Sequence, residues 1–257
     1  MSIDFAYAQA RAQARLGEQL PEDGWRLLES SLGLPQYLAS VRSTVLAPRI
    51  QQFSANVTPH TIERTLREAW RSEVADVARW VPDRWQPAIE WAAWTPYIQP
   101  LAWLLADEPA LPWMAEDPVL AELAVDDSGA RRAAICASPL AALMASEAET
   151  ALPERWFSHW RSLWPATNDE EATGLQSLID AASVYLDTIA RHGTGLRDRR
   201  DARASLVRHA TRMMHQHVEQ PVVVFCHLIV FALELQRLRD GLLRRALFND
   251  ETREHAA

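Results

Sequence analysis

Hydrophobic residues recur along most of this chain at spacings of three and four, which is the period of an α-helix. The clearest case is the segment 58–81, whose apolar stripe consists of Ile62, Leu66, Trp70, Val74 and Val77. Thr58 is a typical N-cap before this stripe, and Pro59 suits the first helical position. The charged residues of the segment are expected on its solvated face: Arg64, Arg67, Glu68, Arg71 and Asp76.

The same period continues elsewhere. Segments 204–218 and 225–242 each carry a long apolar stripe, and shorter helices are predicted at 21–31, 34–43 and 153–164, each with a proline at or beside its start. Only the run 221–225 is rich in β-branched residues, and it leads directly into a helical pattern. The sequence therefore predicts an all-α protein of about ten to twelve helices.

Polar or proline-rich breaks at 106–118, 164–174 and 191–201 divide the chain into three blocks. We expect helical segments at 1–106, 107–191 and 192–257, possible products of a triplication because their closing helices resemble one another weakly. A single compact all-α unit is the alternative.

Composition excludes several chemistries. All 26 basic residues are arginine, so a Schiff-base lysine, a P-loop and a protein-kinase site are impossible. The net charge of −8 argues against general attraction to nucleic acid. Two distant cysteines, Cys136 and Cys226, fit a reducing cytoplasm, and the start of the chain shows no signal-peptide pattern. The longest apolar run, 222–235, is too short to span a bilayer.

Neither metal nor catalytic residues are predicted. His215 and His217 are two positions apart, so they cannot share a helix face, and His209 and His227 complete no metal-binding spacing. The acidic residues Glu147, Glu149 and Glu154 are best explained by a helix N-terminus near Pro153. We therefore expect no catalytic site, no metal and no cofactor.

Two features leave alternatives open. Six tryptophans fall within 34 positions, and they form either a core or part of a docking surface: Trp70, Trp80, Trp85, Trp91, Trp94 and Trp103. The segment from Leu196 to Arg212 contains six arginines interrupted by Asp198 and Asp201. Such a mixed-charge face is usually solvated, and the other interpretation is that it meets an acidic partner.

The helix predicted at the beginning of the chain has two distinct rows of residues. Phe5, Ala8, Ala12 and Leu16 form an apolar row whose small residues permit close helix packing. Tyr7, Arg11 and Arg15 recur at intervals of four, so that Arg11 can stack on Tyr7 while the row stays positive.

This opening and the segments that follow it, YAQARAQARLG, LPEDGWRLLESS and YLASVRST, resemble the beginning of the C-type (also called d-type) subunits of V/A-type ATPases. The segment FALELQRLRDGLLRRALF is similar to the last helix of that family, which carries a glutamate followed by arginines. The chain is shorter than typical members, and its central block matches more faintly.

The resemblance implies an all-helical, funnel-like protein without catalytic activity. It implies a location on the cytoplasmic face of the membrane, where the protein links the central rotor stalk to the proteolipid ring. Its expected interface residues are Tyr7, Arg11, Arg15, Arg237, Arg239, Arg244 and Arg245. Two other hypotheses remain: a free-standing helical adaptor, and an enzyme with an all-α site of unrecognised type.

Overall fold

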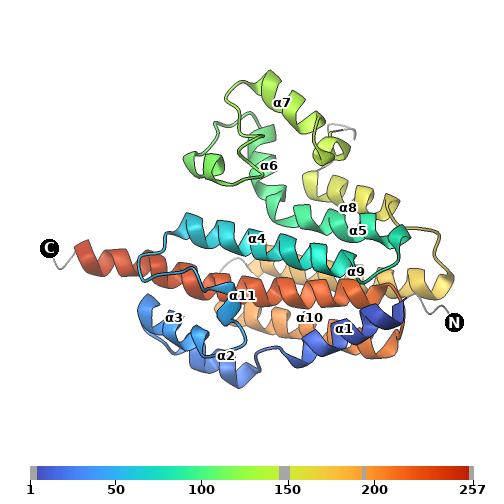
Figure 1. Ribbon diagram of the computed structural model, residues 1–257, viewed down its shortest axis with the longest axis horizontal. Coiled ribbons are helices and arrows are strands. Elements are labelled where there is room, and N and C mark those ends of the chain that lie inside the picture. Colours follow the sequence, from blue (N-terminus) through green and yellow to red (C-terminus); the bar gives the residue numbers. More distant parts are fainter. Residues whose placement is uncertain (1–4, 145–150, 193–194, 255–257) are drawn as a thin grey trace. The chain divides into compact units, whose positions relative to one another are not determined.

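The computed structural model describes residues 5–144, 151–192 and 195–254 (Figure 1). The all-α prediction is confirmed, because these residues form α-helices and short 3₁₀ helices without any β-strand. Within the same ranges, no helix is both long enough and apolar enough to cross a membrane.

The chain divides into two compact units. Unit 1 comprises Met1–Asp83 and Ala166–Ala257, and unit 2 comprises Arg84–Pro165. The boundaries expected near residues 106 and 191 fall inside unit 2 and inside unit 1, so this division differs from three consecutive segments. Whether the helices are related by triplication, and whether they form a funnel, stays a prediction.

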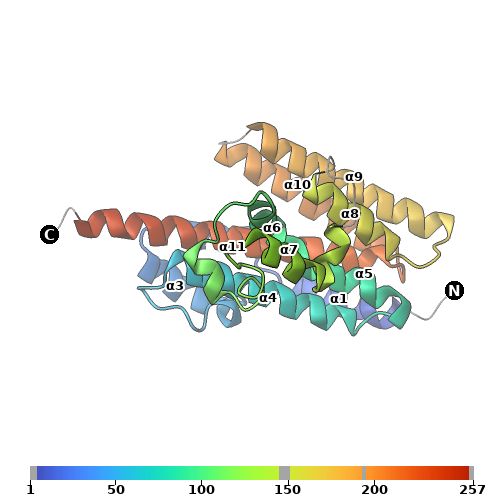
Figure 2. The same ribbon diagram turned by 90° about the horizontal axis from the view of Figure 1, so that it is seen from above.

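Unit 1 is built around its last helix, α11, which runs through the unit with the other helices on several sides (Figures 1 and 2). It packs against α10, α4, α1, α3 and α9. The helices of unit 1 are α1 (Ala6–Gly17), α2 (Glu22–Glu29), α3 (Leu34–Arg42), η2 (Ala47–Arg49), α4 (Pro59–Ala78), α9 (Asp169–His192), α10 (Leu196–Gln216) and α11 (Val222–Glu254).

Helix α4 confirms the predicted start, since Thr58 accepts a hydrogen bond from the backbone of Thr61 and Pro59 begins the helix. The predicted apolar stripe is buried. One expectation for this helix is wrong. Arg67 is buried, although it was expected on the solvated face of α4, and Glu73, which was assigned to no face, is buried as well. Because α4 packs against both α11 and η2, its protein-facing surface is wider than one apolar stripe.

Small residues let α1 lie close to α11. Ala8 and Ala12 are fully buried, and Gln9 between them is also enclosed. The Gln9 amide donates to the Met214 carbonyl over 3.0 Å and accepts from the Glu219 backbone over 3.3 Å. These two hydrogen bonds anchor the beginning of the chain to the end of α10 and the turn before α11. The close packing predicted from the apolar row is seen in the burial of Ala8 and Ala12.

Helices α9, α10 and α11 pack side by side (Figure 2). Their shared core contains Tyr185, Leu206 and Leu233, and the Tyr185 hydroxyl donates to Gln236 over 2.7 Å. This arrangement covers one flank of α11 and leaves the opposite face of α10 to solvent, so α10 has distinct buried and exposed sides.

Unit 2 is held by aromatic side chains. Trp160 donates from Nε1 to the Ala88 carbonyl over 3.0 Å, and Trp91 donates to the Trp156 carbonyl over 3.1 Å. The Trp91 ring stacks on that of Trp156, which stacks on Trp160. The helices of this unit are η3 (Asp83–Trp85, which begins at the boundary), α5 (Gln86–Trp91), η4 (Ala92–Tyr97), α6 (Ile98–Leu105), η5 (Pro112–Glu116), α7 (Ser128–Cys136), η6 (Pro139–Leu143) and α8 (Leu152–Ser162).

The clustered tryptophans are mostly core residues. Trp70 and Trp80 are buried in unit 1, and Trp85 and Trp91 are buried in unit 2. Trp103 is the most exposed of the set, and its indole donates to the Pro109 carbonyl over 2.8 Å. The core interpretation therefore holds for these four buried tryptophans.

Candidate functional site

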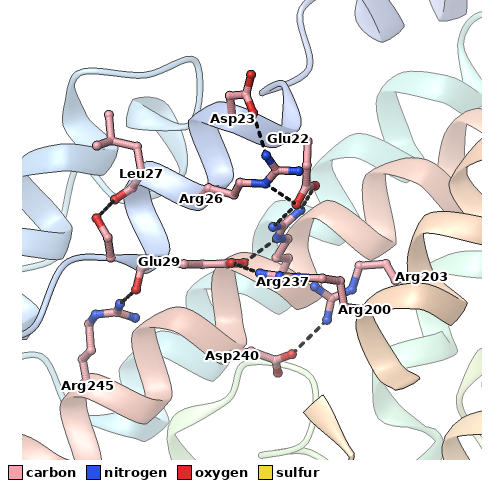
Figure 3. Close-up of polar contacts among 11 residues, drawn as sticks. Glu22, Asp23, Arg26, Leu27, Glu29, Arg200, Arg203, Arg237, Asp240 and Arg245 are labelled. Atoms are coloured by element: carbon pink, nitrogen blue, oxygen red, sulfur yellow. Dashed lines mark hydrogen bonds and ion pairs between the residues drawn. The ribbon is translucent and has the colours of Figure 1, made fainter. Parts of the chain in front are cut away.

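Two of the α11 arginines expected at a partner interface, Arg237 and Arg245, lie in one polar cluster of unit 1 (Figure 3). Arg237 is its centre. Its guanidinium donates to both carboxylate oxygens of Glu22, over 2.6 and 3.0 Å, and to Glu29 over 2.7 Å. The same group lies 4.7 Å from the centre of the Trp25 ring. Since only 10% of its side chain is exposed, Arg237 braces α2 against α11 rather than facing solvent.

We call Arg237, Glu22 and Glu29 the brace between α2 and α11. The pKa values of these three side chains reflect the hydrogen bonds between them. The hydrogen bond from Arg237 lowers the pKa of Glu22. Burial alone would raise the pKa of Glu29, but hydrogen bonds from Arg237 and Arg200 outweigh it and lower that pKa. Burial opposes the charge of Arg237, yet its two carboxylate partners raise its pKa. All three groups are therefore charged at neutral pH.

Helix α10 joins the brace from the other side of α11. Arg200 donates to Glu29 over 2.6 Å, and Arg203 donates to Asp240 over 3.2 Å (Figure 3). Burial raises the pKa of Asp240, although Arg203 and Arg239 favour its charged form. Glu29 thus accepts from arginines of two different helices, which links α2, α10 and α11 through one carboxylate.

Arg245 caps the C-terminal end of α2 through hydrogen bonds to backbone carbonyls. It is buried, and its guanidinium donates to the carbonyl of Glu29 over 2.9 Å and to that of Ser31 over 2.7 Å. These carbonyls lie at and just beyond the C-terminal end of α2, where a helix has no internal donors left. Arg245 therefore supplies the missing hydrogen bonds from 214 and 216 positions away.

A glycine lets α3 approach α11 beside Arg245. A side-chain carbon added at Gly241 would overlap the hydroxyl and ring of Tyr37. The Tyr37 side chain is fully buried, with the Arg245 guanidinium 4.2 Å from its ring centre. Its hydroxyl has no hydrogen-bond partner among the described residues, and burial raises its pKa to about 12. Close packing at this crossing thus depends on Gly241.

The two remaining arginines of the predicted set differ from each other. Arg239 donates from Nε to Glu63 of α4 over 2.8 Å, so it also pairs within unit 1. Arg244 is exposed, and it has no ion pair, hydrogen bond or ring contact with the residues that the structure describes. Of the four predicted α11 arginines, Arg244 is therefore the one that is exposed without a partner among the described residues.

The predicted residues of α1 lie apart from this cluster. Tyr7 is 59% exposed. Arg11 does not stack on Tyr7 as expected; its guanidinium lies 5.2 Å from the centre of the Trp80 ring. Arg15 lies 3.9 Å from Glu18 in a partly exposed pair. The N-terminal row of three residues is therefore spread between solvent and the end of α4.

Sequence reasoning missed a second polar cluster in the core of unit 1. His227 Nε2 lies 2.8 Å from Glu73 Oε1, with side chains only 5% and 3% exposed. Arg49 approaches the same carboxylate at 3.6 Å. Burial raises the pKa of Glu234, a second acid of this cluster. The sequence did contain a signal that Glu73 is buried. Glu73 is three positions from Trp70 and four from Val77, so it lies on the apolar side of α4.

The other candidates do not assemble a site. His215 is exposed, and His217 Nδ1 lies 3.0 Å from Gln220. His209 Nε2 is buried and has no hydrogen-bond partner in the described part of the chain. Glu154 lies in the first turn of α8, and Glu147 and Glu149 lie outside the described residues. Across the described ranges, no three His, Cys, Asp or Glu side chains form a group that could hold a metal ion.

The geometry of the arginine cluster indicates a structural role. Paired, largely buried guanidiniums that bridge carboxylates and helix-end carbonyls hold helices in fixed positions. In comparisons with known proteins, the sequence matches no protein-family model and no curated protein.

Proposed function

We propose that the chain is a non-catalytic coupling subunit that links the rotor stalk of a V/A-type ATPase to its proteolipid ring. The proposal starts from the sequence resemblance at both ends of the chain. It places the protein in the cytoplasm, peripheral to the cytoplasmic face of the membrane, with protein partners and no cofactor.

The observation that supports it most is the way the two resembling ends are joined. Helix α1 packs along α11, and α2 is fixed to α11 by Arg237 and Arg245. A subunit that passes torque between partners has to resist deformation. Charge-assisted hydrogen bonds between segments more than 200 positions apart give such resistance, because bending the unit would separate charged groups from their partners.

Affinity purification from the native host tests this function. We expect a tagged chain, isolated in mild detergent, to recover rotor-stalk and proteolipid subunits in fixed proportions, identified by mass spectrometry. A helical protein of similar size with the same tag is the control. Recovery of neither kind of subunit, from cells in which a rotary ATPase is assembled, would contradict the proposal.

A free-standing adaptor is the second candidate, and one observation favours it. Unit 2 exposes Trp103, Leu111 and Val125, and it contains 11 acidic residues against five arginines. Aromatic and aliphatic side chains at a surface are common in protein-binding sites. Stable co-purification with partners unrelated to an ATPase, together with absence of rotor-stalk subunits, would select this function.

A further inference from the structure

Most of the arginine side chains that the structure describes contact another residue. Among the arginine side chains that the structure describes, only four have no ion pair, hydrogen bond or ring contact. These four are Arg197, Arg208, Arg212 and Arg244. Three of them belong to α10, so the unengaged positive charge is concentrated on a single helix.

The three arginines of α10 also share one face. Arg208 and Arg212 are one turn apart, and Arg197 lies eleven positions, or about three turns, before Arg208. All three are exposed, as is His215 one turn further on. The opposite face of α10 holds the buried residues that pack towards α9 and α11, including Leu206. We call the exposed face, defined by Arg197, Arg208, Arg212 and His215, the α10 basic face.

Acidic residues are sparse on this face. Asp201 lies between Arg197 and Arg208, and no acidic residue occurs from Ala202 to Val218. The whole chain nevertheless has a net charge of −8. Arg208 and Arg212, which have no partner among the described residues, therefore make this face locally positive on a chain that is negative as a whole. A local positive charge of this kind favours binding to an acidic partner.

We propose that the α10 basic face binds an acidic helical segment of a partner protein. A helix with carboxylates four positions apart presents them about 6 Å from each other, which matches the spacing of Arg208 and Arg212. Arg197 extends the match along the axis, about 22 Å from Arg212. The bound segment pairs its carboxylates with guanidiniums that have no partner within the described chain.

The surface fits an acidic protein better than a membrane. No large hydrophobic side chain of the described part of α10 is exposed, so the face has nothing to insert between lipids. Nucleic acid is disfavoured by the net charge of the chain. The inference goes beyond the proposed function, because it holds for a coupling subunit and for an adaptor alike.

Binding of a defined probe tests the inference. The probe is a dye-labelled, alanine-rich helical peptide with glutamate at every fourth position, and fluorescence anisotropy measures its affinity for the full-length protein. We expect R208E/R212E to bind it at least about tenfold more weakly than the unchanged protein. Raising NaCl from about 50 to about 300 mM should also weaken binding, because the pairs are exposed.

The matched control is R79E/R244E, which makes the same charge change at exposed residues of other segments. It should bind the peptide within about twofold of the unchanged protein. Circular dichroism establishes that both double variants are folded. Equal weakening by both variants, or no weakening by R208E/R212E, overturns the inference. So does binding of phosphatidylserine vesicles or a DNA duplex without binding of the peptide.

The peptide-binding test of the α10 basic face can fail independently of the co-purification test of the coupling function. If R208E/R212E binds the peptide normally while rotor-stalk subunits are still recovered from the host, the α10 inference fails and the coupling function stands. If the peptide result is as expected but no rotor subunit is recovered, the α10 basic face is retained and the coupling function fails.

Discussion

Arg237 of α11 and Glu22 of α2, 215 positions apart, form a bidentate ion pair. The two guanidinium nitrogens lie 2.6 and 3.0 Å from the two carboxylate oxygens. Both carboxylate oxygens of Glu22 accept from the guanidinium, which fixes the angle between the two helices as well as their distance. The brace therefore holds α2 in place against α11 and contributes to the stability of unit 1.

Replacing Arg237 with methionine should lower the free energy of unfolding by roughly 2 to 3 kcal/mol, because two partly enclosed carboxylates lose their charged partner. Urea denaturation followed by circular dichroism measures the change. The matched control is Arg26→Met, since Arg26 is 65% exposed and forms surface pairs with Asp23 and, more distantly, with Glu22. It should cost no more than about 0.5 kcal/mol.

A double-mutant cycle separates the pairing from lost packing. E22Q/E29Q combined with R237M should be less destabilising than the sum of the two, by about 1 to 3 kcal/mol. If the effects are additive, Arg237 contributes only through its contact with Trp25, and the brace has no electrostatic role.

Gly241→Ala tests the crossing of α3 and α11. Alanine normally favours a helix over glycine by about 1 kcal/mol. Here the added carbon would overlap Tyr37, so we expect a net loss of about 1 to 2 kcal/mol in the free energy of unfolding. Thermal unfolding of the variant measures it.

A second background shows whether the loss arises from that overlap. With Tyr37 changed to leucine, the same alanine should be neutral or stabilising, because the ring no longer occupies the space. A destabilisation of equal size in both backgrounds would mean that Gly241 is needed for another reason.

Much of the fold was predictable because its signals are local. The N-cap Thr58, the helical stripes and the proline-started short helices depend on residues within a few positions of one another. The confirmed elements α2, α3, α4 and α8 all belong to this kind.

The site was less predictable, for a physical reason. Periodicity tells which side of a helix is apolar, but not how many neighbours enclose it. Because α11 is packed by helices on several sides, polar residues such as Arg237 and His227 are enclosed despite their charge or polarity. Their partners lie 154 to 215 positions away, and no local pattern connects them.

Arg131 illustrates the same problem in unit 2. It is buried, and it donates to the carbonyls of Val125, Leu104 and Glu108, each over 2.9 Å. Arg131→Met should destabilise unit 2 by about 3 kcal/mol, because three carbonyls lose a charged donor. Tryptophan fluorescence reports on this unit, which contains eight of the 11 tryptophans.

Arg132→Met is the internal control, since this neighbouring side chain is half-exposed and pairs with Asp107 at the surface. It should leave the fluorescence-detected transition nearly unchanged. A loss as large as that of Arg131→Met would show that the chain is sensitive to any change in α7 and not to the buried hydrogen bonds.

The buried pair of Glu73 and His227 should give the protein a defined acid sensitivity. Burial alone would raise the pKa of Glu73, but the hydrogen bond with His227 and the nearby charges of Arg15 and Arg49 lower it below the ordinary value of 4.5. A lowered folded-state pKa stabilises the protein fully above the unfolded value. This contribution is lost as the pH falls from 4.5 through the folded-state pKa.

The test is the free energy of unfolding between about pH 3 and pH 6 for the unchanged protein and Glu73→Gln. The difference between them should be largest near pH 6 and shrink as Glu73 becomes protonated. Glu234→Gln should change the slope in the opposite direction, because burial raises the pKa of Glu234 and its charged form opposes folding as the pH rises. A constant difference between the unchanged protein and Glu73→Gln would show that folding does not lower the pKa of Glu73, and would contradict the prediction.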